Sequence, residues 1–302
     1  MPTPILYFPF RLFFFPPQDR LTIIGWVLYA IALILILRKL WQPIKGKNLQ
    51  QWWLYAIFAV LAPLFTLIAG IPMAQAGTIP LPNLPQETTQ PILFLLSAIP
   101  WQVAGGIFGV GPAFIIGLIS GFFLAGWNTH SIFTILETAG MAMCFAYFVQ
   151  QNYRSKVFSF ARHPFAAAII TSLIILPFLL FSQFLSVDGS IAVRIDYALS
   201  QTIRIDFIRI VEILTGGFVV SILYAIKKSW WNKPTFTVPS SIEKKIEYRF
   251  MFGAVPFFVI ILIVLMASTW WVAGGAATKM VETRLKGIAE VTTDSLPYFL
   301  EA

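Results

Sequence analysis

A small set of charged residues lies inside long apolar stretches of this chain. Asp206, Arg209 and Glu212 are spaced three residues apart within residues 205–226, and Glu137 lies within residues 131–150. On a helix this spacing places the first three along one side, where opposite charges can pair. A charged group in a membrane helix is costly, so it typically faces the helix bundle or a functional pathway.

These charges are expected at a similar depth. At 1.5 Å per residue, Glu212 is about 10 Å and Glu137 about 9 Å from the start of its stretch. We therefore expect Glu137 and Arg209 to approach within ion-pair distance, with Glu212 nearby. The candidate polar pocket also takes in residues at or near the ends of apolar stretches, and comprises Glu137, Arg209, Glu212, His130, Asn128 and Gln102.

Two interpretations of this pocket stay open. Glu137 and Arg209 can form an interhelical salt bridge that serves assembly alone, because buried charges need partners. Alternatively they can line an outward-facing pocket for a small ligand whose identity the sequence does not give. Gln102 follows Pro100 closely, so it either lines a cavity at a broken helix or bonds a carbonyl freed by a proline kink.

Other chemistry finds no support in the residue patterns. The chain has no Walker A, HExxH or C-x-x-C motif, and His130 and His163 are far apart. The single cysteine, Cys144, is interpreted as a small core residue. We therefore assign no catalytic residue, no metal ligand and no cofactor, and expect any kinase or cyclase activity to lie in domains outside this chain.

The composition predicts a polytopic membrane protein. Of 302 residues 58% are hydrophobic and 11% are charged, and the mean hydropathy is +0.79, which no soluble globular domain shows. The net charge of +8 comes from Lys and Arg between the apolar runs, as in cytoplasmic loops. The predicted partner is therefore the lipid bilayer rather than nucleic acid, and the fold class is an all-α transmembrane helical bundle.

Eight spanning helices are predicted, each an apolar run long enough to cross a bilayer. Their ranges are 21–37, 52–71, 92–110, 112–126, 131–150, 164–185, 205–226 and 250–272. The corresponding divisions are an interfacial segment 1–20, a seven-helix membrane domain 21–228, a cytoplasmic linker 229–248, an eighth transmembrane helix 249–274 and the start of a truncated extracellular domain 275–302. A short interfacial helix is expected within residues 186–204.

Charge and packing add two expectations. The loop containing Arg38, Lys39, Lys45 and Lys47 is taken as cytoplasmic by the positive-inside rule, which places both ends of the chain outside. A stripe of small residues predicts close contact with a neighbouring helix at the centre of the bundle, since small side chains let helix backbones approach. The stripe comprises Ala113, Gly117, Gly121 and Ala125.

The last 27 residues differ in kind from the rest. Met280, Leu285 and Ile288 alternate with charged residues, at a spacing that suits an amphipathic helix continuing out of the last span. The apolar residues 296–300 follow with no domain to pack against. We therefore expect this sequence to be the N-terminal portion of a longer protein.

Two stretches carry a resemblance to known families. Residues 278–295 resemble the start of an extracellular Cache-type sensor domain, as found in bacterial histidine kinases, diguanylate cyclases and chemoreceptors. The run GPAFIIGLISGFFLAGWNTHSIFTILE, within residues 105–162, is similar to the glycine-rich helices of LytS-type five-helix receptors and MASE-type membrane sensors. It is also similar to the substrate-binding subunits of energy-coupling-factor transporters.

These resemblances imply a function in the bacterial inner membrane. The first is an integral membrane sensory input module that couples a ligand or membrane state to output domains absent from this chain. The alternative is a transporter, or the substrate-binding subunit of one. A second copy of this chain, forming a homodimer, is a further expected partner.

Overall fold

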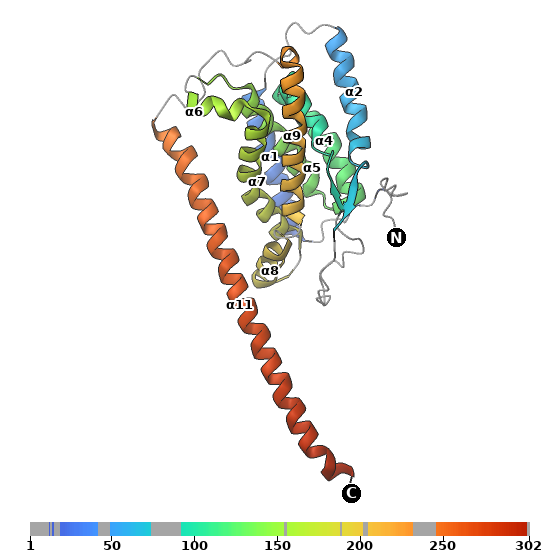
Figure 1. Ribbon diagram of the computed structural model, residues 1–302, viewed down its shortest axis with the longest axis vertical. Coiled ribbons are helices and arrows are strands. Elements are labelled where there is room, and N and C mark those ends of the chain that lie inside the picture. The colour runs from blue at the N-terminus through green and yellow to red at the C-terminus, as the bar shows by residue number, and fades with distance from the viewer. Residues whose placement is uncertain are drawn as a thin grey trace. The chain divides into compact units, whose positions relative to one another are not determined.

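The computed structural model describes Leu12, Phe14 and residues 19–41, 49–73, 92–153, 156–187, 189–201, 205–231 and 246–300. The described chain is helical apart from one two-stranded hairpin (Figure 1), which confirms the all-α fold class. It divides into two units, Met1–Phe252 and Gly253–Ala302. Each unit is described by itself below.

The first unit contains the helix bundle. Its longer helices are α1 (Arg20–Leu40), α2 (Leu49–Phe65), α4 (Val110–Leu124), α5 (Phe133–Gln150), α7 (Pro164–Ser186) and α9 (Phe207–Ile226). Its two strands are β1 (Gly70–Pro72) and β2 (Ile92–Phe94). Its shorter α-helices are α3 (Ile99–Ile107), α6 (Lys156–Ser159) and α8 (Ile191–Gln201). The unit also contains the π-helix η1 (Ala125–Thr129) and the 3-10 helices η2 (Phe160–Arg162) and η4 (Lys228–Trp230). The described part of the second unit lies within α11 (Ile246–Leu300), a single helix of 55 residues.

Five helices in the described part of the chain are long and apolar enough to cross a membrane. They are Arg20–Leu40, Val110–Thr129, Phe133–Gln150, Pro164–Ser186 and Phe207–Ile226, while Trp52–Phe65 is apolar but shorter. These helices indicate a membrane protein in a lipid bilayer. The prediction of eight spans is not supported: the predicted eighth span lies within α11, which is not among these five, and the predicted third is interrupted.

The predicted third span, 92–110, is broken into three pieces. Ile92–Phe94 form strand β2, which pairs antiparallel with β1, with Gly70 opposite Phe94. A turn then leads into the nine-residue α3. Pro100 lies in the first turn of α3, where a missing N–H costs nothing, so the expected proline kink within a long helix is wrong. Gly109, with φ of 102°, ends this segment before α4.

The small-residue stripe of α4 packs against α5, as predicted. Ala113, Gly117, Gly121 and Ala125 are all buried. A Cβ placed on Gly117 would lie 2.7 Å from Ala142 Cβ, and one on Gly121 would lie 2.9 Å from the backbone of Ile135. Neither space admits a larger side chain, so these two glycines set the close approach of the two most buried membrane helices.

One end of the bundle, here termed the hairpin end, carries β1–β2, η1 and α8 (Figure 1). Asn128 of η1 exchanges two hydrogen bonds with the backbone of Ile92, its side-chain N–H donating to Ile92 O at 3.0 Å. Trp26 near the start of α1 donates its indole N–H to Ile132 O at 3.2 Å. The hairpin end therefore gathers the N-terminus of α1, the C-terminal end of η1 and the start of α5.

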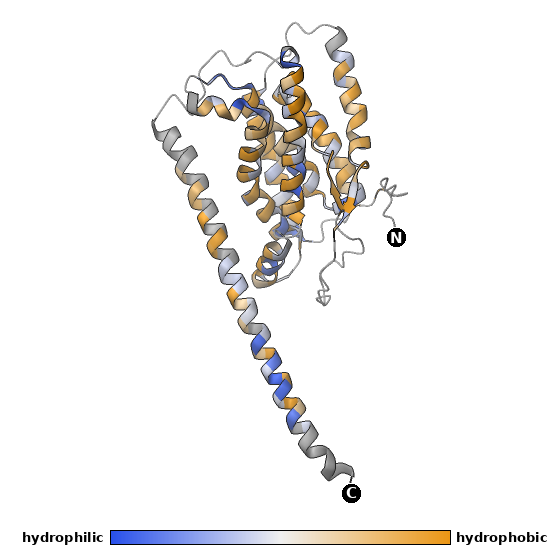
Figure 2. Ribbon diagram, viewed as in Figure 1, coloured by the Kyte–Doolittle hydropathy of each residue, from blue (hydrophilic) through white to orange (hydrophobic). Residues whose placement is uncertain are grey.

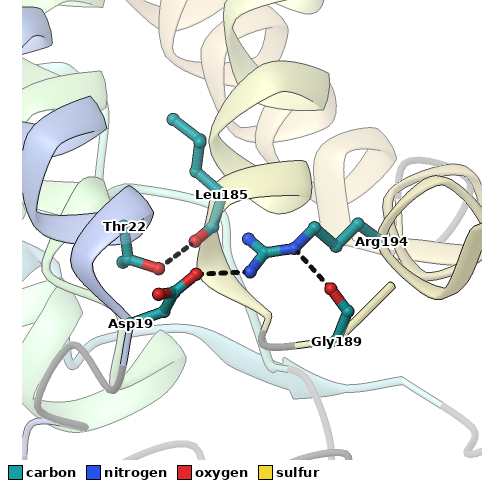
Figure 3. A network of polar contacts seen from close by, with 5 residues as sticks. All are labelled: Asp19, Thr22, Leu185, Gly189 and Arg194. Carbon is teal, nitrogen blue, oxygen red and sulfur yellow. Dashed lines mark hydrogen bonds and ion pairs between the residues drawn. The ribbon is translucent and has the colours of Figure 1, made fainter. Parts of the chain in front are cut away.

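Figure 3 shows how α1, α7 and α8 meet at the hairpin end. The Thr22 hydroxyl donates to Leu185 O at 2.6 Å. Arg194 of α8 donates to the Asp19 carboxylate at 2.6 Å and to Gly189 O at 3.1 Å. The Arg194 hydrogen bond holds the pKa of Asp19, which precedes the first spanning helix, below its ordinary value. The expectation of a short helix within residues 186–204 is thus confirmed, and an ion pair anchors it.

The opposite end, here termed the basic end, collects positive charge. The helix ends at this side carry Arg38 and Lys39 on α1, Arg162 on η2, and Lys227 and Lys228 after α9. Gln150, at the end of α5, donates to the carbonyls of Gly105 and Gly106 at 2.9 Å. The helices between the two ends are largely apolar (Figure 2), and many of their exposed side chains are large and hydrophobic, as in a lipid surround.

Several predicted features fall outside the described residues. These are most of the interfacial segment 1–20, the loop 74–91, Lys45 and Lys47, and the linker residues 232–245.

Candidate functional site: a buried polar cluster near the hairpin end

The buried polar cluster consists of side chains from α5, α7 and α9, and three of its residues belong to α5. Thr134, Glu137 and Thr138 lie in the first two turns of α5 and are buried, Glu137 being only 3% exposed. Spacings of three and four residues bring them to one face of the helix. On this face Glu137 was predicted from the sequence, whereas the two threonines were not, because hydroxyl groups are common in membrane helices.

Arg209 of α9 reaches this face of α5. Its guanidinium donates to Thr134 Oγ1 at 3.1 Å and to Thr138 Oγ1 at 3.5 Å. The side chain is 4% exposed. The predicted ion pair with Glu137 is wrong, since no carboxylate oxygen of the described residues lies within 4.0 Å of the Arg209 nitrogens. The guanidinium nevertheless interacts electrostatically with both Glu137 and Glu212.

The physical reason for this correction lies in the packing of the helices. α7 packs extensively against both α5 and α9. Arg209 spans from α9 to α5 with its long side chain, and the threonine hydroxyls receive its N–H groups. The hydroxyls thus take the place that a direct carboxylate partner would have filled.

Glu137 points to α7 instead. Its Oε1 is hydrogen-bonded to the hydroxyl of Ser182, which is also buried. Ser182 Oγ additionally lies 2.8 Å from Leu179 O in the preceding turn of α7. Ser182 was not predicted from the sequence, because nothing there distinguishes it from the other polar residues of α7.

Glu212 ties α9 to the hairpin. Its Oε1 accepts the backbone N–H of Phe94 at 2.9 Å. One turn later, the Thr215 hydroxyl bonds Leu95 O at 3.1 Å. Glu212, which is 3% exposed, therefore holds the end of β2, and Thr215 holds the turn between β2 and α3.

The other predicted pocket residues lie elsewhere in the bundle. Gln102 of α3 donates its amide N–H to Ile213 O at 2.9 Å, so it joins α3 to α9 through the backbone. Asn128 bonds the backbone of Ile92. His130 lies in the turn after η1, with a left-handed backbone of φ 54°. Gln102 and Asn128 thus serve backbone groups, and neither bonds Glu137 or Arg209 in the described structure.

The cluster is asymmetric in charge. Glu137 and Glu212 are two carboxyl groups, whereas Arg209 is the one basic residue of α9. The buried Asp206, just before α9, has interactions of its own. Buried charges of unequal number are costly in a bundle surrounded by hydrocarbon. The arrangement can hold an ion pair with one additional polar or protonated carboxyl group, which is chemistry of binding and switching rather than of covalent catalysis.

Metal binding finds no geometric support within the described residues. They contain no group of three or more His, Cys, Asp or Glu side chains that could hold a metal ion. Cys144 is a free thiol on α5, consistent with its interpretation as a small core residue.

The comparisons with known proteins add no family. No family model, no curated protein and no solved structure matches this chain.

Proposed function

We propose that this chain is the membrane-embedded sensory input module of a bacterial signalling protein. The buried polar cluster of α5, α7 and α9 receives the stimulus, and α11 carries the resulting movement to output domains. The resemblance of residues 105–162 and 278–295 to sensor regions motivates this proposal. The stimulus is a small ligand or a change in the membrane itself.

The observation that carries the proposal is the continuity of α11. The helix runs without interruption through the apolar residues 250–272 and on through Lys279, Glu282 and Arg284. Figure 2 shows the change from apolar to hydrophilic residues along this one helix. About 20 residues suffice to cross a bilayer, so the remaining turns extend beyond it. A continuous helix is stiff enough to transmit a rotation or a shift along its axis.

The polar cluster supplies the other half of the proposal. It links α5 to α7 through Ser182, α5 to α9 through Arg209, and α9 to the hairpin through Glu212. A change in any one of these contacts biases the packing of several helices together. Intramembrane ionisable residues commonly mark functional sites for this reason.

The proposed topology follows from the charges at the two ends. The basic end faces the cytoplasm and the hairpin end faces outward, because Lys and Arg concentrate on the cytoplasmic side. The polar cluster then lies in the outer half of the bilayer, and residues 250–272 form a further span. The plasma membrane of a bacterium is the proposed location.

Distance measurements by double electron–electron resonance test whether the cluster and α11 are coupled. Spin labels at Lys228 and Thr278, in the full chain with Cys144→Ala and reconstituted in lipid nanodiscs, report one distance distribution. We expect Arg209→Gln and the milder Thr138→Val to shift this distribution. Ile115→Leu, which alters an outward-facing side chain of α4, is the matched control and is expected to leave it unchanged.

An unchanged distribution in folded Arg209→Gln and Thr138→Val proteins would overturn the signalling proposal. Uptake of a solute into proteoliposomes containing the chain would then support the alternative, a transporter or its substrate-binding subunit. Folding of each variant is checked by circular dichroism and by a monodisperse elution profile.

A further inference from the structure

The hydroxyl of Ser182 has more acceptors beside it than it has hydrogens. Its Oγ lies within hydrogen-bonding distance of Leu179 O and of Glu137 Oε1. A carbonyl oxygen only accepts, and an ionised carboxylate only accepts, whereas a serine hydroxyl has one hydrogen to donate. If Ser182 donates to Leu179 O, the contact with Glu137 needs its hydrogen from the carboxyl group.

The two glutamates of the cluster differ in the donors that surround them. Glu212 accepts a backbone N–H from Phe94 at 2.9 Å, and a hydrogen bond of this kind favours the ionised form of a carboxyl group. Glu137 receives no backbone N–H in the described structure, and its hydrogen-bond partner there is the Ser182 hydroxyl. The surroundings of Glu212 therefore favour its ionised form more than those of Glu137 do.

The single positive charge of Arg209 can balance one of the two glutamates. Its described hydrogen bonds go to Thr134 and Thr138, and its electrostatic interactions include both glutamates. With Glu212 ionised, Arg209 and Glu212 make a neutral pair. A second ionised carboxylate at Glu137 would leave a net negative charge in the bundle, which is costly.

The other elements packed against α5 bring no cation close to Glu137. Helices α3, α4 and α7 and the π-helix η1 contain no Asp, Glu, His, Lys or Arg. Arg162 of η2 lies at the basic end, as do Arg38 and Lys39 of α1. Arg20, the first residue of α1, is exposed. The remaining titratable neighbour is Tyr29 of α1, which interacts electrostatically with Glu137. The Tyr29 hydroxyl is buried and has no hydrogen-bond partner among the described residues.

We infer that Glu137 is a proton-binding site within the membrane. Its carboxyl group is protonated in the folded chain and donates a hydrogen bond to Ser182 Oγ. The ligand of this site is the hydrogen ion. When the proton leaves to water, the carboxylate needs a donor, and the Ser182 hydrogen must turn away from Leu179 O to supply it. Proton binding thereby links α5 to α7, whether or not the chain signals through α11.

Infrared difference spectroscopy of the full chain in lipid tests this inference. A protonated carboxyl group gives a C=O stretching band outside the amide region, and hydrogen–deuterium exchange of the acid shifts it. We expect one such band at neutral pH that disappears in Glu137→Gln and fades as the pH is raised. Glu282→Gln, on the charged half of α11, is the matched control and is expected to keep the band.

A Ser182→Ala variant supplies a second readout that does not depend on Glu137 being replaced. Loss of the hydroxyl acceptor weakens the hydrogen bond from the acid, so the band is expected to move to higher wavenumber. Glu137→Asp is expected to shift the band and not abolish it. The inference is overturned if folded wild-type protein shows no band, if Glu137→Gln retains it, if Glu212→Gln removes it in place of Glu137→Gln, or if Ser182→Ala leaves its position unchanged.

Discussion

Glu212 Oε1 accepts the backbone N–H of Phe94 at 2.9 Å, across 118 residues of sequence. This bond joins a membrane helix to the last residue of the short strand β2, at the end of the bundle where α9 begins. Gln102 and Thr215 add two further bonds between α9 and the same segment. Helix α9, which carries Arg209, is therefore fixed to the hairpin. This attachment determines where Arg209 lies in the polar cluster.

Replacing Gln102 tests this attachment. Gln102→Leu removes the donor to Ile213 O while it keeps the approximate volume of the buried side chain. The Ile213 carbonyl lies inside α9 and keeps its helical hydrogen bond, so the substitution removes one net hydrogen bond. Such a bond contributes about 0.5–1.5 kcal/mol, and we expect the free energy of unfolding to fall by that amount. Unfolding in mixed micelles, followed by circular dichroism, measures the change. A stability equal to that of the wild type would mean that α3 and α9 are held by apolar packing alone.

The contact between α4 and α5 gives a second prediction. Gly121→Leu places a side chain where a Cβ alone already lies 2.9 Å from the Ile135 backbone. Overpacking typically costs about 1–3 kcal/mol, and a contact with backbone atoms leaves little room for adjustment. We expect a lower thermal midpoint and a lower yield of folded protein. Ile115→Leu, at an outward-facing position of the same helix, is expected to change neither.

The ion pair of Asp19 and Arg194 predicts a dependence on acid. The Arg194 hydrogen bond lowers the pKa of Asp19 in the folded chain. Its contribution to stability is therefore complete above the ordinary pKa of a carboxyl group and is lost as the pH falls through the lowered value. We expect acid to loosen the contact of α8 with α1. The protection of the α8 amides, taken as their exchange rate relative to the intrinsic rate at each pH, is expected to fall at low pH in the wild type.

An Arg194→Gln variant serves as the comparison for this effect. Without the guanidinium, the exchange of α8 amides is expected to be faster at neutral pH and to respond less to acid. Equal protection in the two proteins at neutral pH would show that the ion pair does not hold α8.

The membrane orientation is tested by cysteine accessibility in a Cys144→Ala background. We expect a cysteine at Gly189, in the hairpin end, to react with a membrane-impermeant maleimide added outside intact cells. A cysteine at Lys228 is expected to react only after permeabilisation. The sequence also predicts that Asn83 and Ala302 are external and Lys244 is cytoplasmic, at positions outside the described residues. Labelling of position 228 from outside, with position 189 protected, would invert the topology.

The sequence predicted some of these features better than others. Charges inside apolar stretches are rare, so Glu137, Arg209 and Glu212 were found from their surroundings. The small-residue stripe likewise predicted its own packing. The strand β2 was missed because Ile92, Leu93 and Phe94 suit a buried helix as well as a strand, and only pairing with β1 decides between them.

The direct partners of the charged groups could not be predicted. Which residue Arg209 meets depends on the rotation of α5 and on the presence of α7 beside both helices. Thr134, Thr138 and Ser182 are unremarkable in sequence and become important only through that geometry. The nearest prediction, an ion pair between Glu137 and Arg209, named two members of the cluster and the wrong contact between them.

A double-mutant cycle on the free energy of unfolding tests the central claim, that Arg209 and Glu212 share the buried charge while Glu137 holds a proton. Arg209→Met removes one partner of a buried pair and is expected to cost about 3–5 kcal/mol. Adding Glu212→Gln, whose amide oxygen still accepts the Phe94 N–H, is expected to restore most of that stability, whereas adding Glu137→Gln is expected to restore little. Recovery by Glu137→Gln and not by Glu212→Gln would contradict the account.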